Sequence, residues 1–164
     1  MGDPLTAGTG FADAVAGFAT GVVVLTVRDG RDDLGTTVTS FTSVSLDPPT
    51  VLAGVAASSY LAEVLGRQRR WAATVLAAGQ RALAGRFAAA GRPSARILLA
   101  SEPHHRGERS GALIPARGVA ALECETRQTV EAADHVLFVA EVLAADCPAP
   151  DTRPLIRVNR RYLT

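Results

Sequence analysis

Aromatic residues are scarce in this chain of 164 residues: they make up 5% of it, although 48% of the residues are hydrophobic. A hydrophobic core must therefore be filled mainly by alanine, valine and leucine. The length suits one domain of ordinary size. We expect residues 1–10 to be a disordered tail and residues 11–164 to form the domain.

Cysteine is also scarce, with only Cys124 and Cys147. A secreted domain held by disulfides usually has more cysteines in a shorter chain. The N-terminus lacks the basic and apolar segments of a signal peptide. No apolar run approaches the ~18 residues of a membrane span. These absences predict a cytoplasmic protein with reduced thiols and no membrane attachment.

Neither positive nor negative charge is in excess, since the chain has 17 basic and 16 acidic residues and a formal net charge of +1. No basic stripe with interleaved aromatic residues is present, so nothing indicates nucleic-acid binding. His104 and His105 lie near two glutamates, but their spacing fits no standard zinc pattern, and we predict no metal site. Cys124 falls in a predicted strand and is interpreted as a small buried hydrophobe.

The hydrophobic pattern predicts many short strands and few helices. Strands are predicted at residues 22–27, 35–45, 51–56, 71–76, 119–124, 136–142 and 154–158. Helices are predicted at residues 11–18, 61–65 and 80–91, and residues 91–112 are interpreted as a long irregular excursion. Strands that do not alternate with helices favour an antiparallel barrel or sandwich over a doubly wound nucleotide fold.

Residues 35–45 are dense in threonine, serine and valine, which suits a pleated strand. A second hydroxyl pair, Ser58 and Ser59, comes directly before a predicted helix. Two interpretations remain open for these residues. The pair could cap the helix beside a solvated strand, or hydroxyls and helix N–H groups together could bind an anion.

Several segments resemble the flavin reductase-like, FMN-binding split-barrel family. The strongest match is residues 35–49, Gly-Thr-Thr-Val-Thr-Ser-Phe-Thr-Ser-Val-Ser-Leu-Asp-Pro-Pro. Further matches follow in the family's order, and they are residues 18–26, 58–59, 75–76, 80–84 with Phe87, 122–124, 134–135, 154–155 and 161–162. The resemblance covers roughly residues 11–163.

The resemblance implies a mainly β fold: an antiparallel split β-barrel of Greek-key type with a few short flanking helices. It implies an enzyme that reduces FMN or FAD with NADH or NADPH. The reduced flavin would pass to a partner flavin-dependent monooxygenase in bacterial secondary metabolism, and the enzyme would be a homodimer.

The family's site residues carry over to matching positions of this chain. The resemblance places backbone N–H groups beside the isoalloxazine ring, and the flavin-binding positions near the ring are Thr37, Val38, Thr39, Ser40, Ala56 and Phe87. Ser58 and Ser59 match the region that holds the flavin phosphate. His135, Arg161 and Tyr162 match residues that face the nicotinamide cofactor, with His135 as the implied catalytic residue.

Three departures from the family pattern stand out. Residues 91–112 lack the family's aromatic pattern, Thr74 stands where relatives usually carry an asparagine, and Ala133 stands where relatives usually carry a glycine before Asp-His. The unusual segment 91–112 motivates a second hypothesis, a split-barrel protein without reductase activity that acts as a ligand-binding accessory or tailoring protein. For His135 a purely structural role, buried and bonded only to backbone, is the alternative to a cofactor-facing one.

Overall fold

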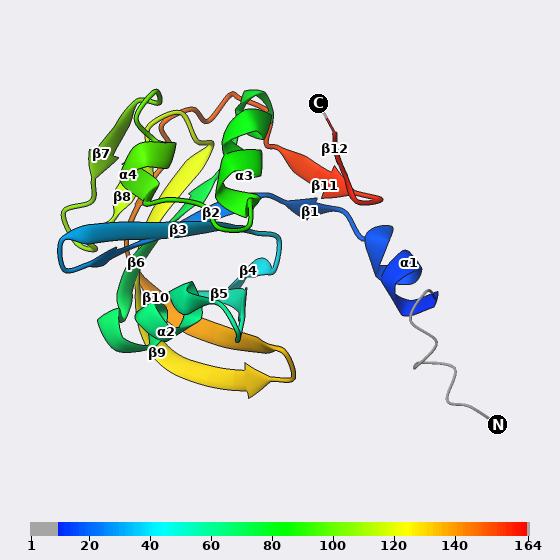
Figure 1. Cartoon of the computed structure of the whole chain (residues 1–164), viewed down its shortest axis with the longest axis horizontal. Helices are drawn as coiled ribbons and strands as arrows, with labels where there is room; N and C mark the ends of the chain where they lie inside the picture. The colour runs from blue at the N-terminus through cyan, green and yellow to red at the C-terminus, as the bar shows by residue number, and fades with distance from the viewer. Residues whose placement is uncertain (1–9, 164) are drawn as a thin grey trace.

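The computed structural model describes residues 10–163. Most of the chain forms a curved antiparallel sheet with the strand order β3-β2-β6-β9-β10-β5-β4 (Figure 1). Its strands are β2 (Val23–Asp29), β3 (Asp32–Val38), β4 (Phe41–Leu46), β5 (Pro49–Ala56), β6 (Arg70–Val75), β9 (Ala120–Ala132) and β10 (His135–Asp146). The predicted mainly β, antiparallel split barrel is confirmed.

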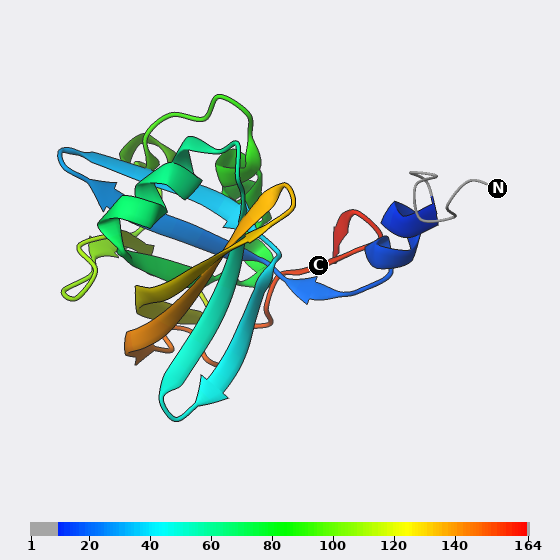
Figure 2. The ribbon, with the colours of Figure 1, turned by 90° about the horizontal axis from the view of Figure 1, so that it is seen from below.

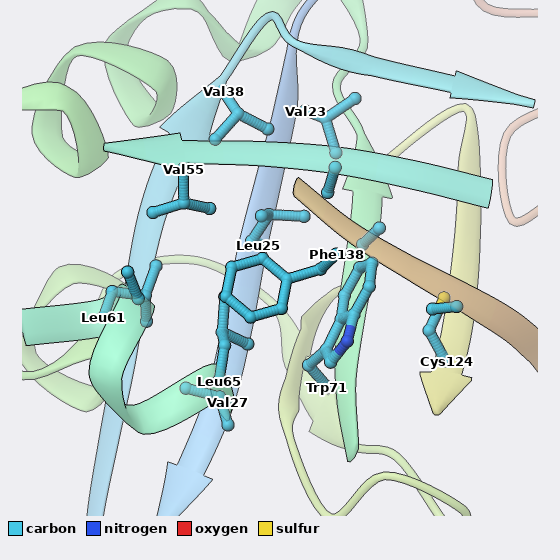
Figure 3. Packing of buried hydrophobic residues seen from close by; sticks show 14 of the residues in the cluster. Val23, Leu25, Val27, Val38, Val55, Leu61, Leu65, Trp71, Cys124 and Phe138 are labelled. Atoms are coloured by element: carbon cyan, nitrogen blue, oxygen red, sulfur yellow. The ribbon is translucent and has the colours of Figure 1, made fainter. Parts of the chain in front are cut away.

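One hydrophobic cluster fills the barrel. Leu25, Trp71 and Phe138 lie at its centre, and each is wholly or almost wholly buried (Figure 3). Helix α2 (Tyr60–Gln68) adds the apolar side of its surface, including Leu65. The buried Trp71 indole N–H donates to the hydroxyl of Thr126 at 2.9 Å, which satisfies the one polar atom of the ring.

A second cluster lies on the other side of β2. Helices α3 (Arg81–Ala88) and α4 (Ala95–Leu98) contribute to it, and the short 3₁₀ helix η1 (Ala78–Gln80) directly precedes α3. Phe87 of α3 is wholly buried there. Cys124, in contrast, belongs to the barrel cluster. Burial, and to a lesser extent the negative charge of Glu123, raises the pKa of the Cys124 thiol to about 12. The interpretation of Cys124 as a small buried hydrophobe is confirmed.

The prediction of one strand over residues 35–45 is wrong, because the chain turns a corner at Thr39 and Ser40. Before the corner β3 pairs with β2, and after it β4 pairs with β5. The Ser40 carbonyl accepts a hydrogen bond from Gly54 N–H at 2.7 Å, which fastens the corner to β5. A Cβ at Gly54 would lie 2.9 Å from that of Ser40, so the close approach requires glycine.

The predicted irregular excursion, residues 91–112, is partly regular. It contains α4 and the short strand β7 (His104–Arg106), which pairs with β8 (Leu113–Pro115). The excursion lies against β3 on the outside of the barrel (Figure 1). The sequence pattern did not predict these elements, because α4 has only four residues and β7 only three.

An arm extends from the barrel body (Figures 1 and 2). It consists of α1 (Gly10–Ala16), β1 (Thr20–Gly21), β11 (Ile156–Val158) and β12 (Arg161–Leu163), and the three strands form a small sheet. Except for Gly10, which begins α1, the predicted N-terminal tail lies outside the described residues. Within residues 10–163, no helix has the length and apolar character needed to cross a membrane.

Candidate functional site

A hollow of about 290 Å³ opens at the corner between β3 and β4. We call it the first hollow, and its walls are Thr36, Thr37, Val38, Thr39, Ser40, Gly54, Val55, Ala56, Ser59, Arg92 and His135. These residues come from the corner, from β5, from the start of α2, from the excursion and from the start of β10. The fold thus brings together segments that are up to a hundred residues apart in the sequence.

The corner presents backbone to the first hollow. β3 is an edge strand of the sheet, so alternate backbone N–H and C=O groups have no partner strand on that side. The Thr37 hydroxyl donates to the Ala84 carbonyl at 2.7 Å and so ties β3 to α3. Val38 is nearly buried. What this wall offers a ligand is therefore chiefly main-chain hydrogen-bonding groups.

Ser59 is the N-cap of α2, because its hydroxyl oxygen accepts from Leu61 N–H at 3.2 Å. The capping interpretation is confirmed, and the same residue also lines the first hollow. A helix N-terminus carries free N–H groups and the positive end of the helix dipole, which favour an anion. The two interpretations of Ser59 are thus compatible.

Arg92 is the site residue that sequence reasoning missed. Its Nε donates to the Gly35 carbonyl at 2.6 Å, and one terminal nitrogen donates to the Ala89 carbonyl at 3.3 Å. No carboxylate within residues 10–163 forms an ion pair with it. Burial lowers the pKa of the guanidinium, but an arginine remains charged in a protein. A cation with free donors therefore faces the first hollow.

A buried ionic cluster holds the excursion in place. The wholly buried carboxylate of Asp33 accepts from Arg96 Nε at 2.6 Å and from a terminal nitrogen of Arg106 at 2.8 Å. The Asp33 carbonyl also accepts from the Ser94 hydroxyl at 3.0 Å. Burial alone would raise the pKa of Asp33, but hydrogen bonds from Arg106 and Arg96 outweigh it and hold this pKa below 3.8. These contacts hold Ser94, Arg96 and Arg106 of the excursion against β3.

His135 stands at the first position of β10, directly after the turn of the β9–β10 hairpin. Its Nδ1 lies 2.9 Å from a carboxylate oxygen of Asp134, and 42% of its side chain is exposed. The hydrogen bond to His135 lowers the pKa of Asp134. The structural alternative required a buried ring bonded only to backbone, so that alternative is wrong. Ala133 holds the turn with φ of +54°, the conformation for which glycine is the usual choice.

Seven of the predicted site residues line the first hollow: Thr37, Val38, Thr39, Ser40, Ala56, Ser59 and His135. Four do not. Ser58 lines an adjoining hollow. Phe87 is wholly buried beneath β3, where a Cβ on Gly35 would meet its ring at 2.5 Å, so it supports the wall from behind. Arg161 and Tyr162 lie on β12 in the arm, and the Arg81 guanidinium stands 5.9 Å from the Tyr162 ring.

The first hollow has the donor set that a flavin nucleotide requires. Main-chain groups of an edge strand can bond the polar edge of a flat ring, and small residues such as Gly54 and Ala56 leave room beside it. Ser59 at a helix start and Arg92 supply donors for a phosphate. The residues present therefore fit a flavin nucleotide. Because the chain contains no lysine, arginine is the cationic side chain available for the phosphate.

Comparison with known proteins agrees with this geometry. The profile of the flavin reductase like domain matches residues 15–164. An NADH-dependent FAD reductase of Streptomyces globisporus is 41% identical over 128 residues, which are 78% of this chain and 70% of the relative.

Two solved structures are also similar. The NADH:FAD oxidoreductase SgcE6 of Streptomyces globisporus C-1027, in complex with NAD and FAD fragments, superposes with a TM-score of 0.88 at 33% identity over 100% of this chain and 95% of that one. The styrene monooxygenase flavin reductase of Pseudomonas putida S12 gives a TM-score of 0.82 at 34% identity, over 94% and 96% of the two chains.

Proposed function

The chain belongs to the flavin reductase-like family, and we propose on that basis that it is an NADH-dependent flavin reductase that binds FMN or FAD in the first hollow. The observation that carries the proposal is the first hollow itself, in which the edge of β3, Ser59, Arg92 and His135 meet. NADH is preferred to NADPH as the donor because the similar Streptomyces proteins are named for NADH.

The role of the protein is to bind and orient, because the two cofactors supply the hydride chemistry between them. Main-chain groups of residues 37–40 bond the polar edge of the flavin ring. Ser59 and Arg92 bind its phosphate with charge-assisted hydrogen bonds. His135, held by Asp134, would orient the nicotinamide cofactor.

Steady-state kinetics test this function directly. Purified protein should oxidise NADH when FMN or FAD is added, with saturation in both substrates, and NADPH should give a lower kcat/KM. Heat-denatured protein under the same conditions is the control for direct reduction of flavin by NADH. A rate equal to that control with both flavins and both nicotinamides would contradict the proposal and favour the accessory-protein hypothesis.

We further propose a partner flavin-dependent monooxygenase that uses the reduced flavin. The similar Pseudomonas protein is named as the flavin reductase of a styrene monooxygenase. The first hollow opens to solvent beside an exposed strand, which is compatible with release of the flavin. A cytoplasmic location is proposed as well, since both cysteines are free thiols and NADH is consumed.

A homodimer is proposed from the arm. Phe18 is 73% exposed on it, and Phe11, Val15 and Leu163 are also exposed. Burying these apolar residues of the arm against a second subunit would be more favourable than leaving them exposed to water. A further hollow of about 420 Å³ between the arm and the corner, lined by Phe18 and Ser40 among others, would lie in this interface.

Light scattering tests the homodimer. The mass should be twice the 17.0 kDa of one chain at micromolar concentration. Phe18→Asp should shift the mass toward one chain, whereas Val130→Asp, a change at an exposed apolar residue of the β9–β10 hairpin, should not. A wild-type mass of one chain would contradict the dimer.

A further inference from the structure

A separate hollow lies at the start of α3 and has no part in the function proposed so far. It measures about 420 Å³, and it shares no residue with the first hollow. We call it the α3 hollow. Its walls come from η1 and α3, from the excursion, from the turn after β8 and from the connection between β10 and β11. That connection runs past the start of α3 (Figure 1).

Main-chain hydrogen bonds hold the connection against the chain that precedes α3. Ala78 N–H donates to the Arg153 carbonyl at 2.8 Å, and Leu155 N–H donates to the Leu76 carbonyl at 2.8 Å. Between these two contacts, the residues at 77 and 154 form an antiparallel bridge. The α3 hollow is therefore preformed, and its volume falls within the roughly 300–1,000 Å³ of most small-molecule sites.

The apolar part of the lining consists mostly of small side chains. Leu83 and Ala77 are almost wholly buried, and Gly79, Ala82 and Pro148 extend the apolar surface around them. Small side chains leave a broad surface that the flat face of an apolar ligand can cover. Burial of that face would supply most of the binding free energy, since the hydrophobic effect scales with the apolar area removed from water.

The polar part of the lining mainly offers hydrogen-bond donors. Arg117 forms no ion pair within residues 10–163, so its guanidinium has N–H groups for a ligand. The Gln80 side-chain oxygen accepts from Ala77 N–H at 2.9 Å, which leaves the amide nitrogen to donate. The Thr152 hydroxyl adds a third donor. One cation with neutral donors beside it favours an anionic group on the ligand.

Glu102 decides which anion fits best. Its carboxylate belongs to the same lining, and one oxygen accepts from a terminal nitrogen of Arg86 at 2.6 Å, so Arg86 pairs its charge. A phosphate dianion would lie near this carboxylate with Arg117 as its one cationic partner. A carboxylate carries a single charge, and its two oxygens match the fork of the Arg117 guanidinium. The lining therefore favours a monocarboxylate.

We propose that the α3 hollow binds a small aromatic carboxylate, with the ring on the apolar surface around Leu83 and the carboxylate paired with Arg117. Gln80 donates a further hydrogen bond to the same carboxylate. The ligand is neither a flavin nor a nicotinamide nucleotide, and this inference does not depend on the proposed function. It adds a second small-molecule site on the opposite end of α3 from Phe87, which supports the wall of the first hollow.

Nuclear magnetic resonance titrations of the wild-type protein test the proposal, with benzoate and benzamide as the probes. Benzoate should shift the amide signals of the α3 hollow in a saturable way, with a Kd of about 1 mM, as expected for so small a ligand. Benzamide has the same ring without the charge and should bind at least about tenfold more weakly. No saturation by about 20 mM benzoate, or equal affinities for the two probes, would overturn the proposal.

Four variants locate the site. Arg117→Gln should weaken benzoate binding at least about tenfold, and Ala82→Trp, which fills the α3 hollow without changing charge, should abolish it. Arg153→Gln removes an exposed arginine that does not line the hollow, and it should bind benzoate like the wild type. Arg92→Ala, in the first hollow, should also leave benzoate affinity unchanged. Equal losses in Arg117→Gln and Arg153→Gln, or a loss in Arg92→Ala in place of Arg117→Gln, would refute the assignment.

Discussion

Two regions that contribute walls to the first hollow, residues 35–49 and the excursion, residues 91–112, differ in how they are held. The first region is fixed by strand pairing with β2 and β5 and supplies main-chain groups. The excursion is fixed by side chains, with Asp33 at the centre, and supplies the cation Arg92. They touch where Arg92 Nε donates to the Gly35 carbonyl. The main-chain groups of the site are therefore positioned by strand pairing, whereas its cation, Arg92, is positioned by side-chain contacts.

The largest expected effect comes from Asp33→Asn, which should detach the excursion. Removing one partner from a buried ionic cluster typically costs several kcal/mol, and we expect a loss of about 4 kcal/mol in the free energy of unfolding, measured by urea denaturation. Hydrogen exchange should increase in residues 91–112 more than in β3. Asp32→Asn, an exposed neighbour, is the matched control and should change stability little. A loss below about 1 kcal/mol would show that the excursion is held by other contacts.

The same cluster predicts how stability depends on pH. The pKa of Asp33 is lower in the folded protein than its ordinary value of 3.8. Its contribution is therefore fully present above pH 3.8 and is lost as the pH falls through the lower folded pKa. The stability difference between wild type and Asp33→Asn should shrink only in that acidic range. A difference that already declines near neutral pH would contradict this assignment.

Gly35→Ala should damage the strand region by steric overlap. The new Cβ would lie 2.5 Å from the Phe87 ring and 2.9 Å from the Leu25 carbonyl oxygen, and one of these neighbours is backbone. Overpacking of this kind costs about 3 kcal/mol. Gly66→Ala, on an exposed helix position with nothing nearby, is the control and should be neutral or slightly stabilising. If Gly35→Ala melted like the wild type, the tight contact between β3 and α3 would be disproved.

Arg92→Ala should weaken flavin binding while leaving the fold intact. A hydrogen bond to a charged group is worth about 2 kcal/mol, so the Kd for FMN should rise roughly thirtyfold. The exposed Arg31→Ala, which removes the same charge elsewhere, separates a local contact from net charge. Equal flavin affinity in Arg92→Ala and Arg31→Ala would remove Arg92 from the phosphate site.

The smallest effect is expected for His135→Ala, a residue outside both regions. Loss of one neutral hydrogen bond costs about 0.5–1.5 kcal/mol, which predicts a roughly three- to tenfold higher KM for NADH. Flavin affinity and the thermal midpoint should stay nearly unchanged, because the side chain is partly exposed and bonds only to Asp134 within the described residues. A fall in flavin affinity as large as the rise in KM would refute the nicotinamide-facing role.

The two regions also differ in how well the sequence predicts them. Residues 35–49 form a local pattern from which the strand character could be predicted, whereas the wall residues Thr37 to Ser40 were predicted from the resemblance to the family. The corner at Thr39 and Ser40 could not be predicted, because it depends on a change of pairing partner from β2 to β5. Propensity describes single segments and carries no information about which strand lies alongside.

Arg92 was missed for a related reason. The excursion has no periodic pattern, and its attachment is a set of ionic contacts to Asp33, which lies 63 residues before Arg96 and 73 before Arg106. Among 17 basic residues, nothing local distinguishes the one that faces the first hollow. Glycines 35 and 54 were the available signal, since both permit close backbone approaches at this site.

An anaerobic titration tests the central claim, that this chain reduces a flavin bound in the first hollow with NADH. Stoichiometric FAD is bound to the wild-type protein without oxygen, and NADH is added in small steps. We predict that the visible flavin absorption bleaches in proportion to the NADH added and returns when air is admitted. A flavin that binds but stays oxidised through excess NADH, or a protein that binds no flavin, would contradict the claim.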